Sequence, residues 1–151
     1  MRAIQVSVVG SGSEWDSRAE EVGRLLAERG CTVVTGGGAE VMAAAARGAK
    51  QAGGQTVGIL PGESPDEANE WIDFAVVTGT GHARNLAVAA SGDAVIAVGG
   101  SWGTLSEVAF ARRLGRPTVL LDPGLKVEGE GILRAATPDQ AVELALSELE
   151  T

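Results

Sequence analysis

Few of the residues that build redox, metal or membrane sites occur in this sequence. The one cysteine, Cys31, excludes a disulfide within the chain, and the one histidine, His82, has no cysteine or carboxylate at metal-ligand spacing. The two lysines, Lys50 and Lys126, fall near a predicted helix end and in an acidic loop, so neither suits the buried Schiff-base lysine of a pyridoxal-phosphate enzyme. No apolar stretch reaches the roughly 18 residues of a membrane-spanning helix, and the N-terminus lacks the apolar region and cleavage site of a signal peptide. We therefore expect a cytoplasmic protein with no metal site and no resident cofactor.

Basic residues are also scarce. The chain has 12 lysines and arginines against 20 aspartates and glutamates, which gives a formal net charge of −8 at pH 7. Nucleic-acid backbones and anionic membrane surfaces are recognised through basic patches, so neither is expected as a partner. Any anionic small molecule must be bound by groups concentrated at one place.

Short β-branched runs alternate with longer Ala- and Leu-rich stretches along the whole chain. That alternation is typical of a mostly parallel sheet with helices on both faces, and 151 residues suit one compact unit. We predict a single three-layer α/β domain of Rossmann-like type over residues 1–151. Strands are expected at Ile4–Val9, Thr32–Thr35, Thr56–Leu60, Phe74–Val77, Ala94–Val98 and Thr118–Leu121, with a short edge strand near Leu133–Ala135. Helices are expected at Glu14–Glu28, Glu40–Gln51, Ala83–Ala90, Thr104–Leu114 and Pro138–Leu149, and a surface loop with one helical turn at Pro61–Asp73.

Three glycine clusters directly follow predicted strands: Gly10-Ser11-Gly12-Ser13, Gly36-Gly37-Gly38 and Gly99-Gly100-Ser101-Trp102-Gly103-Thr104. Any one of them is explained by a tight turn between a strand and a helix. In an open α/β sheet, however, ligands bind beyond the carboxyl ends of the strands, where helix N-termini offer unpaired N–H groups to an anion. Three clusters at that edge predict a phosphate-bearing ligand. The first cluster lacks the third glycine of the dinucleotide fingerprint, which argues against NAD.

Arg84 and Glu107 are the candidate catalytic residues. A fixed cation and a fixed carboxylate beside a phosphosugar suit a reaction that develops positive charge on a ribose ring, such as glycosidic cleavage. The alternatives are structural: Thr104-Leu105-Ser106-Glu107 fits a capping box, in which Thr104 caps the helix and Glu107 bonds back to it, and Arg84 fits a solvated helix end. His82 either contacts the ligand or holds its loop.

Three segments carry a family resemblance that covers almost the whole chain. Val33–Met42 (VVTGGGAEVM), Gly81–Asn85 (GHARN) and Val98–Glu107 (VGGSWGTLSE) resemble the motifs of the Lonely Guy (LOG) family and its small Rossmann-like relatives. The resemblance implies either a phosphoribohydrolase, which releases a free base from a nucleoside 5′-monophosphate, or a non-catalytic carrier of a phosphorylated pterin such as molybdenum cofactor. It places Arg84 and Glu107 at the catalytic positions. With the glycine clusters it gives this set of expected ligand-binding residues: Gly10, Ser11, Gly12, Ser13, Gly36, Gly37, Gly38, Met42, Gly81, His82, Asn85, Gly99, Gly100, Ser101, Trp102, Gly103 and Thr104.

The sequence departs from the plant-type LOG pattern in ways that its small relatives share. Val98 stands in place of a proline, one extra residue separates Gly100 from Gly103, and Asn85 stands in place of a lysine. Glu40 stands where those relatives usually have glycine, and its carboxylate competes with a phosphate for the same N–H groups. Hydrolase, carrier and plain nucleotide-binding domain therefore all stay open. The resemblance also implies a homodimer or higher homo-oligomer, for which the Ala-rich stretch Ala43–Ala49 offers a close-packing helix face.

Overall fold

The strands of the protein form one parallel sheet. The structure is a computed structural model, and it describes residues 1–12 and 15–150. Seven strands are present in this described part, in the spatial order β4-β3-β2-β1-β5-β6-β7 and with every neighbouring pair parallel. The strands are β1 (Gln5–Ser11), β2 (Thr32–Thr35), β3 (Thr56–Leu60), β4 (Phe74–Val77), β5 (Ala94–Gly99), β6 (Thr118–Leu121) and β7 (Ile132–Ala135). The predicted Rossmann-like three-layer class is confirmed, with a sheet that is wholly parallel among the described strands.

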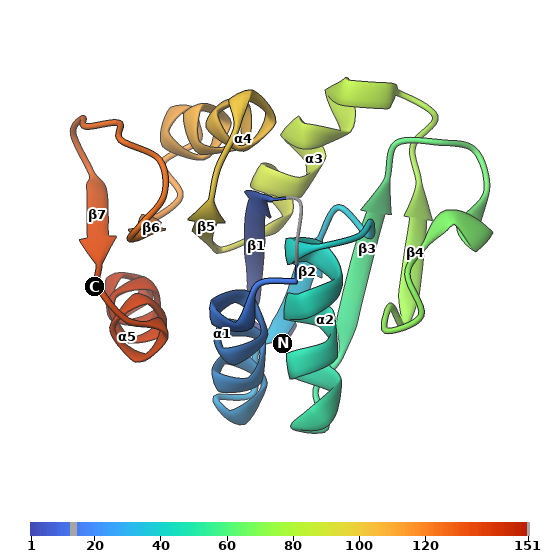
Figure 1. The fold of residues 1–151 in the computed structure, drawn as a ribbon, viewed down its shortest axis with the longest axis horizontal. Helices are drawn as coiled ribbons and strands as arrows, with labels where there is room; N and C mark the ends of the chain where they lie inside the picture. Colours follow the sequence, from blue (N-terminus) through green and yellow to red (C-terminus); the bar gives the residue numbers. More distant parts are fainter. Residues whose placement is uncertain (13–14, 151) are drawn as a thin grey trace.

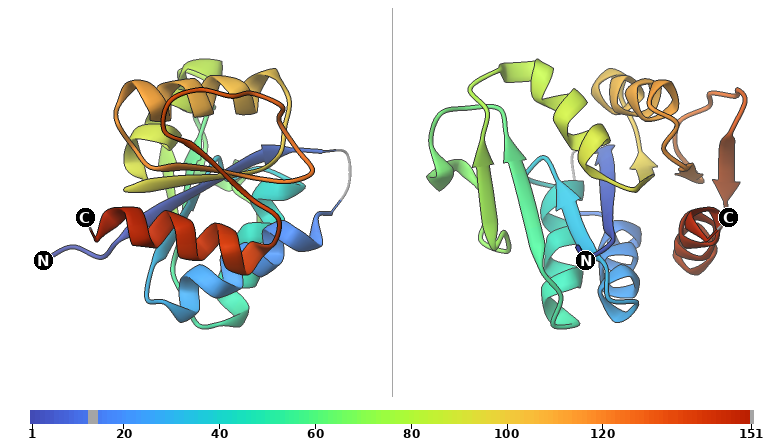
Figure 2. Two further views of the ribbon diagram at one scale, coloured as in Figure 1. Left: turned by 90° about the vertical axis from the view of Figure 1, so that its left-hand side faces the viewer. Right: turned by 180° about the vertical axis from the view of Figure 1, so that it is seen from behind.

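Helices cover both faces of this sheet (Figures 1 and 2). The helices are α1 (Ser17–Glu28), α2 (Val41–Gln51), α3 (Arg84–Ser91), α4 (Trp102–Arg113) and α5 (Pro138–Leu149). One buried cluster packs α1, α2 and α5 against one face, and a second packs α3 and α4 against the other. The predicted helical turn in the loop before β4 is the short 3-10 helix η1 (Pro65–Glu67), and a second one, η2 (Gly81–Ala83), precedes α3.

Helices α1 and α2 approach each other closely because glycines face backbone at their contact. A Cβ atom added to Gly23 would lie 2.0 Å from the Ala45 carbonyl oxygen, and one added to Gly48 would lie 1.9 Å from the Glu20 carbonyl oxygen. The alanines between Ala43 and Ala49 are almost fully buried by the packing of α2 against α1 and against the sheet. The expectation that they form a contact between copies of the chain is therefore wrong, since the same chain already covers them.

The order of the strands sets where a ligand can bind. From β1 the chain builds outward to β4 on one side, then crosses back and builds from β5 to β7 on the other. The carboxyl ends of β1 and β5 thus flank the point at which the winding direction reverses, and open α/β sheets hold ligands at such a point. Among the described residues, no helix is both long and apolar enough to span a membrane.

Candidate functional site

A cavity of about 160 Å³ opens at the carboxyl ends of β1 and β5. It combines residues from β1, the loop after β2, the start of α2, η2, the start of α3 and the first half of α4. Its lining therefore comes from all three glycine clusters and contains both candidate catalytic residues. The lining residues are Val8, Val9, Gly10, Ser11, Gly36, Met42, His82, Arg84, Asn85, Ser101, Gly103, Thr104 and Glu107.

The first glycine cluster begins inside β1 rather than after it. The pairing of β1 with β5 continues to the end of both strands, so that Gly10 lies beside Val98 and Ser11 beside Gly99. A Cβ atom on Gly10 would lie 1.9 Å from the Val98 carbonyl oxygen, which explains why glycine is needed there. The Ser11 and Thr104 hydroxyls lie 3.3 Å apart and connect β1 to the start of α4. Ser13, which was also expected to bind the ligand, lies outside the described residues.

The second cluster uses most of its polar groups inside the protein. The Gly37 N–H donates to Thr35 Oγ1 at 2.9 Å, and the carbonyls of Gly37 and Gly38 accept from the side-chain amide of Asn69. Gly36 alone of these glycines lines the cavity, and its carbonyl accepts a 2.6 Å hydrogen bond from Arg84 Nη1. The carbonyls of this cluster therefore accept hydrogen bonds from the Asn69 and Arg84 side chains, which shape the cavity.

The third cluster forms the N-terminus of α4, which starts at Trp102, two residues earlier than predicted. The amides of the first helical turn have no partner within a helix. Ser101 occupies the capping position but makes no side-chain capping bond. Asp16 caps α1 and Thr137 caps α5 through their side chains, whereas α2 and α3, like α4, have no side-chain cap. The start of α4 borders the cavity through Ser101, Gly103 and Thr104 and has no side-chain cap, which is the arrangement that binds phosphate.

The capping-box alternative for Thr104 and Glu107 is wrong. Because α4 begins at Trp102, both side chains lie inside the helix, and both are buried. Glu107 is 9% exposed and borders the cavity, and no hydrogen bond from another described residue contributes to its pKa. Burial raises the pKa of the Glu107 carboxyl to about 7, and the positive charge of Arg84 acts in the opposite direction. Carboxyl groups buried in this way titrate near the pH at which acid–base catalysts work.

Arg84, at the first position of α3, is held by contacts far along the sequence. Its Nη1 donates to the Gly36 carbonyl at 2.6 Å and to the Ile59 carbonyl at 3.0 Å, while its Nε donates to Asn85 Oδ1 at 3.0 Å. Burial lowers its pKa from the ordinary value, whereas the charge of Glu107 raises it. The alternative of a solvated helix-end arginine is therefore wrong. The guanidinium is a fixed cation in the wall of the cavity.

Asn85 connects this arginine to the third glycine cluster. Its Nδ2 donates to Ser106 Oγ at 3.1 Å, and Ser106 Oγ donates to the Gly103 carbonyl at 2.6 Å. His82 borders the cavity from η2 and is exposed. The structure thus gathers these expected residues in one place, and their contact with a ligand stays a prediction.

Seven of the expected ligand-binding residues do not line the cavity. Gly37 and Gly38 are turned toward Leu60 and Met42, and Gly100 packs against Leu125. The positive φ of Gly99, +67°, lets the chain turn out of β5. The residues outside the lining are Gly12, Gly37, Gly38, Gly81, Gly99, Gly100 and Trp102.

Sequence reasoning missed the residues that shape the site from the side. Val8 and Val9 line the cavity from β1, although their sequence pattern is that of any buried strand. Asn69 holds the second glycine cluster from the loop before β4. That loop contains Pro, Gly, Asp, Glu and Asn together, so nothing local distinguishes Asn69 from its neighbours.

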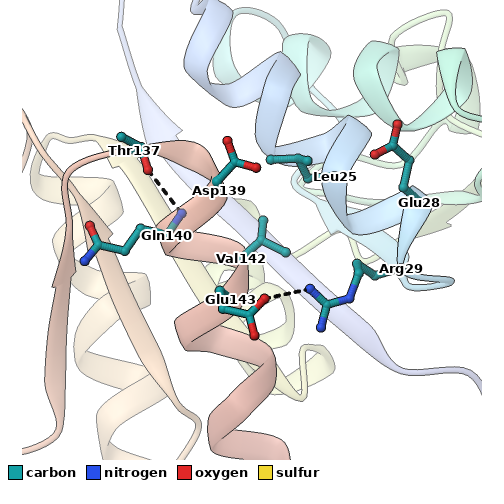
Figure 3. Close-up of a pocket in the computed structure, with 8 residues that line it drawn as sticks. All are labelled: Leu25, Glu28, Arg29, Thr137, Asp139, Gln140, Val142 and Glu143. Carbon is teal, nitrogen blue, oxygen red and sulfur yellow. Dashed lines mark hydrogen bonds and ion pairs between the residues drawn. The ribbon is translucent and has the colours of Figure 1, made fainter.

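A larger hollow, of about 460 Å³, lies between the C-terminal end of α1 and α5 (Figure 3). Several of its polar groups are already engaged: Arg29 pairs with Glu143 at 2.9 Å, and Thr137 accepts the capping bond from the Gln140 N–H. Glu28, Asp139 and Glu143 make its rim acidic, which disfavours an anionic ligand. The smaller cavity is therefore the candidate site.

Known proteins resemble this chain over its full length. Residues 3–148 match the model of the SLOG cluster4 family. The molybdenum cofactor binding protein from the phototrophic bacterium Rippkaea orientalis superimposes with a TM-score of 0.92 at 36% identity, over 100% of this chain and 99% of that chain. The molybdenum cofactor carrier protein from Chlamydomonas reinhardtii gives a TM-score of 0.89 at 32% identity, over 99% and 100% of the two chains. A Mycobacterium tuberculosis protein named cytokinin riboside 5′-monophosphate phosphoribohydrolase is 36% identical over an alignment of 129 residues that covers 76% of this chain and 69% of that protein. The resemblance stated from the motifs is confirmed.

Proposed function

Because this chain belongs to the SLOG cluster4 family, we propose that its cavity at the carboxyl ends of β1 and β5 binds a phosphorylated small molecule, with the phosphate at the N-terminus of α4. One observation carries the proposal: the N-terminus of α4, formed by the third glycine cluster, opens into the cavity without a side-chain cap. The relatives are named for ligands of this class, a cytokinin nucleoside monophosphate and molybdenum cofactor. In a chain of net charge −8, such a local set of N–H groups and one fixed arginine is what an anion requires.

We propose further that the protein hydrolyses the N-glycosidic bond of a nucleoside 5′-monophosphate. The bond between ribose C1′ and the base nitrogen breaks with its electron pair passing to the base. Water then supplies hydroxide to C1′ and a proton to the base, which leaves free base and ribose 5-phosphate. The ionised carboxylate of Glu107 stabilises the positive charge that develops on the ribose ring. Arg84 neutralises the phosphate or assists the departing base.

The support for a catalytic Glu107 is that its buried carboxylate makes no capping or hydrogen-bonding contact with another described residue that would stabilise the fold. The side chain does not cap α4, and burial raises its pKa to about 7 although the charge of Arg84 opposes the rise. Perturbed carboxyl groups that border a cavity cluster at catalytic sites. A carboxylate that only maintained the fold would be expected to have a hydrogen-bonding partner.

The test is to incubate purified protein with AMP and a panel of other nucleoside monophosphates, and to measure free base and ribose 5-phosphate. We expect turnover by the wild type and a loss of at least about 100-fold in Glu107→Gln, while Glu143→Gln, an exposed glutamate on α5, keeps wild-type turnover. Since the ionised carboxylate is the active form, kcat/KM should rise with pH and level off above about 7. Equal turnover in Glu107→Gln and wild type would refute the catalytic role.

The second candidate function is a carrier that binds a phosphorylated pterin without converting it. The observation that favours it is the extent of the structural likeness, because two molybdenum cofactor proteins match this chain over 99% or more of its length. The same helix N-terminus serves either function. Binding of nucleoside monophosphates without release of base from any of the panel, together with a pterin that co-purifies, would favour the carrier.

The expected homo-oligomer stays a prediction, as does the cytoplasmic location. For an interface between copies, we propose the outer edge of β4, where Phe74 is 55% and Val76 is 47% exposed. An edge strand presents unpaired N–H and C=O groups, and apolar side chains beside such an edge favour pairing with a second copy. Light scattering on the purified protein measures the stoichiometry.

A further inference from the structure

The candidate cavity is too small to enclose a whole nucleotide or pterin. Its volume of about 160 Å³ lies below the roughly 300–1,000 Å³ of cavities that surround a complete small molecule. If it holds the phosphate and sugar, as the proposed function requires, the planar ring must lie on the surface outside. Whatever receives that ring must therefore adjoin the cavity.

An apolar hollow of about 440 Å³ adjoins the cavity across Ser101, which lines both. Its other lining residues are Trp102, Leu105 and Leu125. Leu125 packs directly on the backbone of the third glycine cluster, since a Cβ atom on Gly100 would lie 2.4 Å from Leu125 Cγ. The hollow is thus continuous with the proposed phosphate-binding turn.

Trp102 is the most exposed large apolar side chain after the terminal Met1, at 84% of its surface. The other two tryptophans differ from it: Trp15 and Trp71 pack edge to face with ring centroids 5.5 Å apart. An indole left exposed at the first position of α4 contributes little to the core. Its flat surface is suited to stacking with another aromatic ring.

We infer that Trp102, with Leu105 and Leu125, forms the surface on which the planar heterocycle of the ligand lies, while its phosphate binds at the N-terminus of α4. The inference rests on the proposed function and adds to it that the ring, a nucleobase or a pterin, is selected by stacking rather than by enclosure. Stacking tolerates different ring edges, because every base offers a π face. The site accordingly favours phosphorylated molecules with a flat ring over sugar phosphates.

The experiment compares AMP with ribose 5-phosphate, which has the phosphate and sugar but no ring. Affinities are measured calorimetrically for the protein with and without Trp102→Ala, in the Glu107→Gln background so that AMP is not consumed. We expect Trp102→Ala to weaken AMP binding about five- to 100-fold, the range that stacking of one base supplies, and to change ribose 5-phosphate binding less than about twofold. Trp102→Phe should retain most of the AMP affinity.

Matched controls separate this inference from the proposed function. Leu114→Ala, which removes a 40% exposed leucine just past the other end of α4, should alter neither affinity. An equal loss for both ligands in Trp102→Ala, or intact AMP binding, would overturn the stacking surface while the phosphate site stands. Failure of both ligands to bind the parent protein at millimolar concentration would overturn the proposed function, and the stacking surface with it.

Discussion

Replacement of Glu107 by glutamine should stabilise the protein at alkaline pH while it abolishes turnover. Burial raises the pKa of Glu107 from 4.5 to about 7, so the folded protein binds a proton more tightly than the unfolded chain does. Between these two pH values the folded state holds more protons, and its stability therefore falls as pH rises. Above pH 7 the ionised, buried carboxylate lowers the free energy of unfolding by a constant amount. Glutamine has nearly the same shape and no charge.

The magnitude follows from the two pKa values. A gap of about 2.5 pKa units corresponds to about 3.5 kcal/mol, at about 1.4 kcal/mol per unit. Part of this loss in the free energy of unfolding is already present at pH 5, which lies above the unfolded-state pKa of 4.5. The stability advantage of Glu107→Gln over wild type should therefore grow by about 2.5 kcal/mol between pH 5 and pH 8. Titrations common to both proteins cancel in this comparison.

The assay is urea denaturation followed by circular dichroism at pH 5 and pH 8, for wild type, Glu107→Gln and Glu143→Gln. Glu143 pairs with Arg29 on the surface, with 68% of its side chain exposed, and such pairs contribute little to stability. The free energy of unfolding of Glu143→Gln should stay within about 0.5 kcal/mol of the wild-type value at both pH values. A constant difference between Glu107→Gln and wild type from pH 5 to pH 8 would show that Glu107 does not have a raised pKa.

Three further changes test other parts of the structure. Glu40 has a φ of +52°, a conformation that strains any residue with a side chain, so Glu40→Gly should raise the free energy of unfolding by about 1 kcal/mol. A lower free energy of unfolding in urea would count against strain at this position. Gly10→Ala should lower the free energy of unfolding by at least about 3 kcal/mol, because its Cβ would overlap the Val98 carbonyl. A loss under about 1 kcal/mol would mean that β1 and β5 separate easily. Phe74→Glu should convert an oligomer to monomers in light scattering with little change in melting temperature, and an unchanged molar mass would exclude the β4 edge as the interface.

The sequence predicted the elements well because their signals are local. Apolar β-branched runs gave β2, β3, β4 and β6 with the bounds that the structure has, and the cap-like Thr137 marked the start of α5. The errors were also local. Glycines at the ends of β1 and β5 were assigned to turns, although pairing between the two strands continues through Gly10 and Ser11. A strand end is decided by its neighbour, which lies about 90 residues away in this chain.

The Thr104–Glu107 motif at α4 shows that local sequence also does not determine how the residues of the site are placed. Thr104 and Glu107 have the spacing of a capping box, but the helix starts at Trp102, so neither residue caps it. The spacing alone is compatible with both arrangements. Only the packed structure distinguishes a surface cap from a carboxylate that is 9% exposed at a cavity.

What the amino-acid sequence determined by itself was the alternation of strands and helices, the edge of the sheet at which the glycine clusters meet, and the choice of Arg84 and Glu107. The tertiary structure alone decided the chemical state of those two side chains. Arg84 is fixed by carbonyls of Gly36 and Ile59, and the pKa of Glu107 is raised because packed elements exclude water from it. Desolvation and long-range hydrogen bonds depend on which segments meet in space, and no local pattern of residues encodes that.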